Sequence, residues 1–203
     1  MDYTEYQYLW PPRPETKIAP TMLGFYQKRG FLAQKKKNGT CTVIFARGNE
    51  VIFKTRHNDD HKMWSPQADH IKFFSGSQGW NIFVAELLHS KVTGGPKHEL
   101  YIHDQLVNDG FSLVGKTFAE RQAMLLARFP GGKSESDQYR IADRITLAKN
   151  FAGGFSTLFG QLGAEDEGLV LKDPKAVLRA CLKPDSNKGW QVKCRIAHAN
   201  YSF

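Results

Sequence analysis

Three consecutive lysines, residues 35–37, stand directly before Asn-Gly and a segment rich in β-branched residues, within QKKKNGTCTVIF. Three interpretations fit this pattern. It could be a solvated hairpin turn with charged shoulders, because Asn-Gly favours tight turns. It could bind phosphate through the lysine ammonium groups. Alternatively, Lys36 could be a nucleophile, since a lysine amine attacks electrophiles when it is held in its neutral form.

The sequence after Lys36 contains charged residues inside segments that otherwise have the composition of buried strands. A strand interior usually excludes charge, so we expect these side chains to line one polar cleft between sheets. Lys193 and Arg195 alternate in WQVKCR and therefore point to the same face of a strand. The charged residues in question are Arg56, Glu86, Asp104, Glu167, Lys172, Lys193 and Arg195.

The elements that must position these residues follow from hydrophobic periodicity and turn residues. We expect a short helix within 21–31 that ends near Gly30, and a hairpin of strands at 41–46 and 50–56 around RGNE. A second helix at 117–129 has a capping box formed by Thr117 and Glu120. A third helix is predicted at 136–151. Further strands are predicted at 80–92, 98–107, 168–173 and 190–197. Without regular βαβ alternation, this mixture favours an α+β fold with antiparallel sheets.

The composition is that of a folded protein with an anionic partner. The 203 residues suit one domain, 1–203, and 41% of them are apolar, which is enough for a core. The net charge of +8 favours nucleic acid or nucleotides as partners. No apolar run is long enough to span a bilayer, and the first ten residues are not a secretory signal.

The first 20 residues hold four of the nine prolines, so we expect an extended arm that lies over the surface. The three cysteines, Cys41, Cys181 and Cys194, are scattered and show no CxxC spacing. This usage indicates reduced thiols in a cytoplasmic protein and not a disulfide framework or a zinc site.

Six of these segments, taken in order, resemble the motifs of the covalent nucleotidyltransferases: ATP-dependent DNA ligases, RNA ligases and mRNA capping enzymes. The resemblance covers roughly residues 30–196, and EGLVLK is the closest match. The sequence departs from the family in lacking the Asp-Gly before Glu86 and in having His103 where an aromatic residue is usual. The matching segments are KKNG at 36–39, FKTR at 53–56, VAEL at 84–87, IHDQL at 102–106, EGLVLK at 167–172 and WQVKCR at 190–195.

The resemblance implies a nucleotidyltransferase fold of class α+β, in which two antiparallel sheets flanked by helices hold ATP in a central cleft. Lys36 would attack the α-phosphate and carry AMP, while Lys35 and Lys37 would contribute to the field that activates it. Lys193 would meet the α-phosphate. Glu167 would hold Mg²⁺ or Mn²⁺, and Glu86 would take the ribose or a metal-bound water.

Other residues of the cleft would bind the nucleotide. Gly39 would let the backbone approach it closely, Arg56 would hold the ribose or an incoming 5′-phosphate, and either His103 or Tyr101 would stack on adenine. The implied catalytic residues are Lys36, Lys193, Arg195 and Glu167. The implied nucleotide-binding residues are Lys37, Asn38, Gly39, Arg56, Glu86, His103 and Lys172.

The activity implied is that of an ATP-dependent polynucleotide ligase, which joins 5′-phosphate and 3′-hydroxyl ends of a nicked duplex through a lysyl-AMP intermediate. We expect a monomer in the cytoplasm, or in the host cytoplasm if the source is viral or a phage, with a role in DNA or RNA repair. Residues 104–129 resemble DNA ligases, whereas NGT after the lysine resembles RNA ligases, so the strand type stays open.

Only ten residues follow Lys193, so we expect no OB-fold domain at that end and look elsewhere for nucleic-acid contacts. The candidates are Arg13, Lys28, Arg29, Lys54 and Lys62. Two other functions fit the same residues. One is a capping-type RNA guanylyltransferase, which would use GTP. The other is a catalytically degenerate module that binds nucleic acid without reacting.

Overall fold

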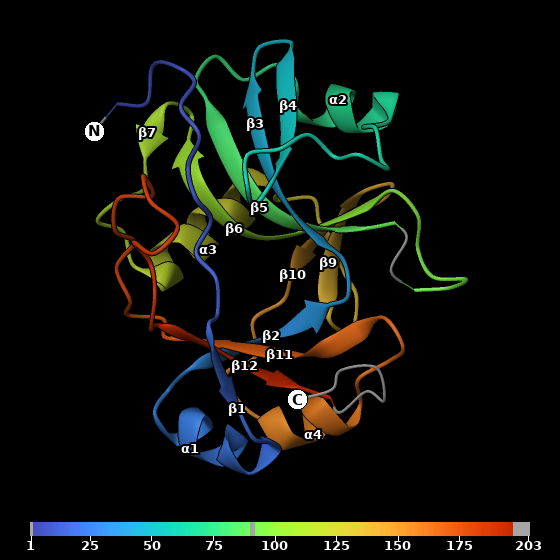
Figure 1. Ribbon diagram of the computed structural model, residues 1–203, viewed down its shortest axis with the longest axis vertical. Helices are drawn as coiled ribbons and strands as arrows, with labels where there is room; N and C mark the ends of the chain where they lie inside the picture. The colour runs from blue at the N-terminus through green and yellow to red at the C-terminus, as the bar shows by residue number, and fades with distance from the viewer. Residues whose placement is uncertain (1, 90–91, 197–203) are drawn as a thin grey trace.

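The computed structural model describes residues 2–89 and 92–196, which form two sheets (Figure 1). Residues of both sheets line a cleft between them. The small sheet has the strand order β1-β12-β11-β2. The large sheet has the order β4-β3-β5-β6-β10-β9-β8, with β7 paired to β6. No helix in the described ranges is long and apolar enough to cross a membrane. The predicted strands 80–92 and 190–197 include positions 90–91 and 197, which lie outside the described residues.

The small sheet is apolar on one face and polar on the other. Leu169 and Leu171 of β11 pack with Ala33 of β2 against the helices, beneath Leu23 and Phe155. Because side chains alternate along a strand, the intervening residues point into the cleft. The elements are β1 (Thr16–Ile18), β2 (Leu32–Lys37), β11 (Asp166–Lys172), β12 (Gln191–Arg195), the 3₁₀ helix η1 (Pro20–Met22), α1 (Leu23–Lys28) and α4 (Phe155–Gly160).

The large sheet is apolar on both faces over its central strands. Ile44 and Phe83 belong to the core on one side, and Val43 and Val84 belong to the core on the other. Burial on both faces explains why the sequences of these strands are nearly continuous apolar runs. The elements are β3 (Thr40–Arg47), β4 (Glu50–Thr55), β5 (Asn81–Leu88), β6 (Glu99–Asn108), β7 (Phe111–Ser112), β8 (Lys133–Ser134), β9 (Gln138–Ala142), β10 (Ile145–Ala148), α2 (Ala68–Phe74) and α3 (Phe118–Arg128).

Several predicted elements are confirmed. The hairpin turns at RGNE between β3 and β4, and α1 ends just before Gly30, which has a positive φ. The capping box of α3 is formed as expected, since Thr117 Oγ1 accepts from the Glu120 backbone and Glu120 accepts from the Thr117 backbone. The mixed architecture with two sheets and few helices agrees with the predicted class.

Two predictions about the sheets were wrong. The expected helix at 136–151 is the hairpin of β9 and β10, which turns at Arg144 with a φ of 60°. Residues 145–148 are buried, because β10 lies between β9 and β6; this tertiary pairing overrides the helical pattern. The sheets are also not purely antiparallel, since β10 pairs with β6 and β1 pairs with β12 in parallel. Helices α2 and α4 were not predicted.

The N-terminal arm, residues 2–15, crosses from the large sheet to the small one (Figure 1). The Tyr3 amide donates to the Gly110 carbonyl (2.7 Å), the Tyr8 hydroxyl donates to the Thr55 carbonyl (2.8 Å), and the Trp10 amide donates to the Cys181 carbonyl (2.7 Å). The chain then enters the small sheet as β1. The arm is therefore extended, as expected, and it is docked at several points.

Gly168 of EGLVLK lies in a bulge of β11 where the register shifts between Asp166 and Gly168. Its φ is 148°, and a Cβ at this position would overlap the Cys194 carbonyl oxygen and lie 2.8 Å from Arg195 Cα. Only glycine fits between β2 and β12 here. The bulge also changes the direction of the preceding residue, and the Glu167 side chain contacts Lys36 in the cleft.

Replacing Gly168 by alanine should destabilise the fold by about 3 kcal/mol or more, because a methyl group there must displace backbone and adopt a strained φ. Denaturant unfolding of the purified variant measures this. The control is Gly24→Ala in α1, where a Cβ meets nothing within 4 Å; it should raise stability by about 0.5–1 kcal/mol. Equal stability of Gly168→Ala and the wild type would contradict the assignment.

Candidate active site

Lys36 lies next to the corner where the chain leaves the small sheet and enters the large one. The Asn38 amide donates to the Glu165 carbonyl (2.9 Å), which ends the pairing of β2 with β11. A Cβ at Gly39 would lie 2.5 Å from the Leu87 carbonyl oxygen and 2.7 Å from Glu86 Cγ. The close approach that Gly39 permits in the structure is therefore to β5, and it brings Glu86 beside Lys36. An approach to nucleotide at Gly39 stays a prediction.

Three strands of the small sheet place three charged groups together. Gly168 is in register with both Lys36 and Arg195, so their side chains share the cleft face. Lys36 Nζ forms an ion pair with Glu167 Oε2, and the Arg195 guanidinium lies 3.3 Å from the same oxygen. The Lys36 side chain is 17% exposed and that of Glu167 is 10% exposed. The amine is thus accessible from the cleft while its partner is nearly covered.

Glu86 faces this group from the large sheet. Burial raises the pKa of its carboxyl from 4.5 to about 7, and Lys36 opposes that rise. Arg56, at the end of β4, also acts on Glu86, and both residues line the cleft with Lys36. The sequence analysis had placed Lys36, Glu86, Glu167, Arg56 and Arg195 at one site, and the structure brings all five together.

Lys193 lies on the cleft face of β12, two residues before Arg195. Its Nζ donates to the Pro14 carbonyl of the arm (3.1 Å). Burial lowers the pKa of Lys193, and the neighbouring charges of Arg195 and Lys36 lower it further. Lys193 and Lys36 line the same hollow, while the expected contact of Lys193 with the α-phosphate stays a prediction.

Lys35 and Lys37, which were expected to contribute to the field around Lys36, are each paired with aspartates. Alternation along β2 turns them away from the Lys36 side. Lys35 lies 3.0 Å from both Asp137 and Asp166, while Lys37 lies 3.0 Å from Asp166 and 3.4 Å from Asp137. Burial opposes the charge on Lys35, but hydrogen bonds to the two aspartates outweigh it and raise its pKa. Two positive charges are thus compensated by two negative ones.

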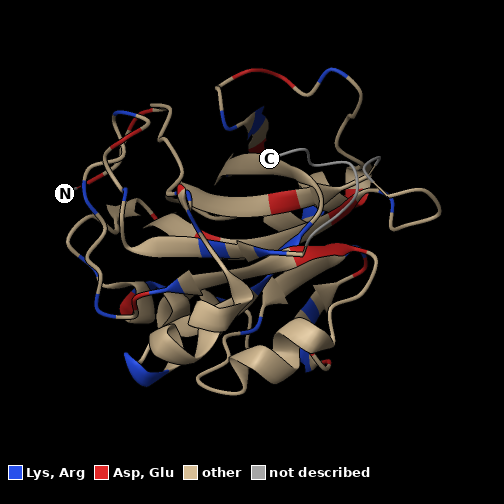
Figure 2. Cartoon of the chain, turned by 60° about the horizontal axis from the view of Figure 1, so that its bottom comes forward, with Lys and Arg blue, Asp and Glu red and all other residues tan. Residues whose placement is uncertain are grey.

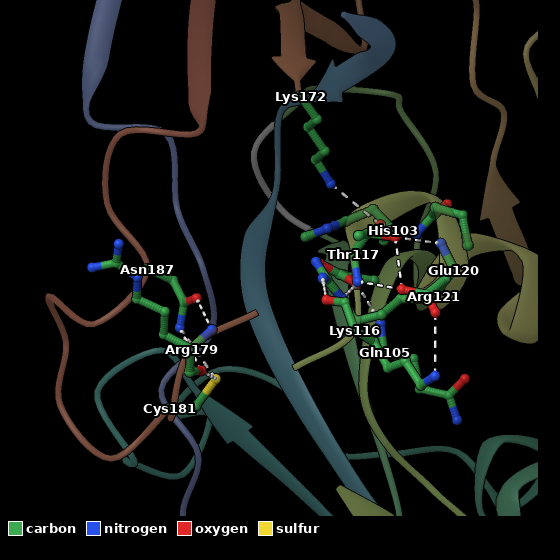
Figure 3. A network of polar contacts seen from close by, with 12 residues as sticks. His103, Gln105, Lys116, Thr117, Glu120, Arg121, Lys172, Arg179, Cys181 and Asn187 are labelled. Carbon is green, nitrogen blue, oxygen red and sulfur yellow. Dashed lines mark hydrogen bonds and ion pairs between the residues drawn. The ribbon is translucent and has the colours of Figure 1, made fainter. Parts of the chain in front are cut away.

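Lys172 lies deep in the cleft and not among the phosphate-facing cations. Its Nζ donates to the His103 carbonyl (3.3 Å; Figure 3). The same Nζ lies 4.7 Å from the Phe118 ring centroid. Burial lowers the pKa of Lys172 to about 8. Tyr101 and His103 share the cleft face of β6. Tyr101 is almost fully buried, so His103 is the more open of the two expected stacking residues.

Asp104 belongs to the framework of the site. Arg121 of α3 holds both of its carboxylate oxygens at 2.9 Å, and both residues are buried. Burial alone would raise the pKa of Asp104, but the Arg121 guanidinium outweighs it and lowers the pKa. The pair fastens β6 to α3 and thereby fixes the neighbouring His103. Burial, helped by the Lys172 charge, lowers the pKa of His103 to about 3, so its ring is neutral at physiological pH.

The side-chain amides of Gln34, Gln122 and Asn150 form a chain of hydrogen bonds beside the cleft, here called the amide relay. The sequence analysis did not predict it. Gln122 Nε2 donates to the His103 carbonyl (3.1 Å), so its oxygen must face the other way. That oxygen accepts from Gln34 Nε2 (3.3 Å) and from Asn150 Nδ2 (3.1 Å). Gln34 Oε1 therefore points away from the relay and accepts no hydrogen bond from a described residue. The available signal was the place of Gln34 two residues before Lys36, on the same strand face.

The five residues expected to bind nucleic acid are not gathered in one place. Arg13 lines the cleft beside Lys36. Lys54 is held by Asp60 (2.8 Å), and Lys62 is exposed in the loop after β4. Lys28 and Arg29 lie at the end of α1, which packs on the apolar face of the small sheet, away from Lys36. Figure 2 shows the charged segments on the strands as well as on the outer loops.

The residues beside Lys36 fit a magnesium ion that arrives with a nucleotide. Within the described ranges, no group of three or more His, Cys, Asp or Glu side chains could hold a metal alone. Glu86 and Glu167 are nonetheless close enough to influence each other. Mg²⁺ is commonly bound by one or two carboxylates together with waters and substrate phosphates. The buried Nδ1 of His103, which has no partner among the described residues, is a polar atom that a nucleotide could satisfy.

Comparison with known proteins gives the fold of this arrangement. No protein-family model and no curated protein sequence matches the chain. The ligase domain of LigD from M. tuberculosis matches with a TM-score of 0.58 and 14% identity, over 91% of this chain and 59% of that one. A mycobacterial DNA ligase D complexed with ATP and MES matches with a TM-score of 0.54 and 16% identity, over 91% and 60%. A Lig E DNA ligase matches with a TM-score of 0.52 and 15% identity, over 82% and 62%.

The chain has the fold of a DNA ligase domain. The similarity confirms the fold that the motif order indicated, and the chain spans about three fifths of each of these structures. At these identities the likeness concerns the fold alone. The chemistry must therefore be argued from the residues around Lys36.

Glu86 should make stability depend on pH in a defined direction. Its folded pKa of about 7 lies above its ordinary value of 4.5, so the folded state binds more protons between these two values. Its contribution is therefore full below pH 4.5 and is lost as pH rises towards 7. Glu86→Gln, which cannot titrate, should gain stability relative to the wild type across this range in urea unfolding.

The control variant is Glu50→Gln, at an exposed position at the start of β4. It tests whether loss of any carboxylate changes the pH dependence of stability in the same way. A difference between Glu86→Gln and the wild type that stays constant from pH 4.5 to 8 would show that Glu86 is not held in its neutral form.

Proposed function

We propose that this protein is an ATP-dependent polynucleotide ligase that joins 5′-phosphate and 3′-hydroxyl ends through a covalent Lys36–AMP intermediate. The observation that carries the proposal is the Lys36 amine itself. It is accessible from the cleft, it is paired with Glu167, and Arg195 lies beside the same carboxylate. The fold is that of ligase domains, one of which is complexed with ATP.

In the first step, Lys36 Nζ attacks the α-phosphorus of ATP. A phosphorus–nitrogen bond forms, the bond from the α-phosphorus to the bridging oxygen breaks, and pyrophosphate leaves. The amine attacks only after losing a proton, and Glu167 is the carboxylate in contact with it. Lys193 and Arg195 face the same space and would stabilise charge on the transferring phosphoryl group. Mg²⁺, when bound through Glu86 and Glu167, would neutralise part of the charge on the phosphates.

In the later steps, AMP passes from Lys36 to a 5′-phosphate of the nucleic acid, which regenerates the lysine and forms a pyrophosphate linkage. The neighbouring 3′-hydroxyl then attacks that 5′-phosphorus, a phosphodiester forms and AMP leaves. Arg56 lies at the edge of the cleft, where it lines further hollows that extend away from Lys36. It is the residue best placed to hold the incoming 5′-phosphate.

The amide relay supports ATP over GTP as the nucleotide. The relay fixes Gln34 so that its oxygen, an acceptor, is left for the cleft. Adenine has an exocyclic amine that can donate to such an oxygen, whereas guanine has a carbonyl oxygen at the same ring position, which would be repelled. This polarity favours the ligase over the capping-type guanylyltransferase.

Lys36→Ala should abolish nucleotide attachment. Intact mass after incubation with ATP and Mg²⁺ should show an AMP adduct on the wild type and on Lys28→Ala, a control in a distant helix. The Lys36→Ala protein should show none, because the attacking amine is missing. Each protein is first treated with pyrophosphate, which removes any AMP already attached.

Three other outcomes of this experiment would each contradict the proposal. An adduct formed only from GTP would indicate capping chemistry. An adduct that persists in Lys36→Ala would place the nucleophile elsewhere. Absence of any adduct on the folded wild type would leave a module that binds nucleic acid without reacting.

Gln34→Leu should reduce the preference for ATP over GTP by about tenfold or more, because loss of one well-placed hydrogen bond is worth about 1–3 kcal/mol. The preference is the ratio of the two dissociation constants, measured by calorimetry. Inosine triphosphate carries the guanine carbonyl without the 2-amino group, so it should bind the wild type as weakly as GTP. Equal binding of ATP and inosine triphosphate would remove Gln34 from base recognition.

A further inference from the structure

A second hollow, of about 300 Å³, adjoins Lys36 on the side of the N-terminal arm. Its walls carry five cationic side chains: Arg13, Lys36, Arg56, Lys193 and Arg195. Two carboxylates, Glu15 and Glu167, contact members of this group. The positive charges thus outnumber the negative ones around a space that opens next to the attacking amine. Such a space attracts a small, highly charged anion.

Arg13 is the member of this group that comes from outside the two sheets. It stands between Pro12 and Pro14, so its neighbours have fixed φ values and its own backbone is restricted to extended conformations. The arm is also held on both sides of it. The Trp10 amide donates to the Cys181 carbonyl (2.7 Å), and Lys193 Nζ donates to the Pro14 carbonyl (3.1 Å).

Arg13 lines both the hollow and the cleft that holds Lys36, and its charge acts on Lys193, which lines the same hollow. One nitrogen of the Arg13 guanidinium lies 3.0 Å from Glu15, which leaves the rest of the planar fork available. Glu15 is itself held by Lys188 (3.3 Å). The Arg13 side chain is 43% exposed, so a ligand reaches it without displacing the core. A guanidinium fork presented in this way matches the oxygens of a phosphate group.

We propose that Arg13, presented by the proline-flanked arm, binds a phosphate group in the hollow beside Lys36. The phosphate is either the β,γ-pair that leaves ATP as pyrophosphate or the 5′-phosphate of the strand to be joined. The choice between these two sources rests on the proposed function. The phosphate site itself is inferred independently of that function, from the cations that line the hollow.

The first test measures binding without turnover. Inorganic pyrophosphate is titrated by calorimetry into the wild type, Arg13→Ala, Arg13→Lys and Arg47→Ala. Arg47 is the matched control, because its side chain is 43% exposed and pairs with a glutamate, as that of Arg13 does, and it lines neither the cleft nor the hollow. Arg13→Ala should weaken binding about tenfold or more, because a charged hydrogen-bonding partner is lost. The affinity of Arg13→Lys should fall between those of the wild type and Arg13→Ala, and that of Arg47→Ala should equal that of the wild type.

The second test separates the two sources of phosphate. Single-turnover rates are measured for AMP attachment from ATP and for closure of a nick that already carries a 5′-adenylate. A slower first reaction with an unchanged second one assigns the site to the β,γ-phosphates. The reverse pattern assigns it to the nucleic acid. Arg47→Ala should change neither rate.

The proposal and the proposed function fail in different ways. If Arg13→Ala and Arg47→Ala bind pyrophosphate equally well and react at equal rates, Arg13 binds no phosphate, whatever the wild type catalyses. If the wild type attaches no AMP but loses pyrophosphate affinity on Arg13→Ala, the phosphate site stands and the ligase function fails. Arg13 is exposed, so Arg13→Ala should keep its unfolding midpoint, which a thermal melt checks.

Discussion

The passage of the chain from one sheet to the other at Asn38 and Gly39 is the constraint on which the site depends. The small sheet holds β2 up to Lys37, and β3 begins at Thr40, so two residues make the crossing. So short a crossing is possible because Gly39 has no side chain, which leaves room for the Leu87 carbonyl and the Glu86 side chain of β5. The crossing fixes the distance between Lys36 on one sheet and Glu86 on the other, and the cleft between the sheets opens at this point.

The three lysines before this crossing have different surroundings, because successive side chains of a strand point to opposite sides. Lys36 faces the cleft, and its neighbours join Asp166 of the small sheet to Asp137 near the large one. Ion pairs of this kind add little stability once desolvation is counted, but breaking one partner leaves an uncompensated charge. Their contribution here is to position the sheets. The buried pair of Asp104 and Arg121 positions β6 in the same manner.

How far the sequence predicts this molecule depends on the range of the interactions. The strands near Lys36 and the capping box of α3 follow local patterns, and they were predicted correctly. The hairpin of β9 and β10 looked helical, because its strand character comes from pairing with β6, more than 40 residues away. The Gln34–Gln122 contact joins residues 88 positions apart, and no local pattern reports it. The sequence identified the charged residues of the motifs and placed Lys36 with Glu167. It did not identify Asp137 and Asp166 as the partners of Lys35 and Lys37.

The parallel pairing of β1 with β12 has a consequence for how the molecule behaves among its copies. Without β1, the strand that carries Lys193 and Arg195 would form the border of the small sheet, with a row of unpaired amide and carbonyl groups. Such a border recruits strands from other chains. The arm covers three residues of this border and leaves β1, a shorter strand, as the edge. The same segment that reaches Lys36 therefore limits strand pairing between copies of the chain.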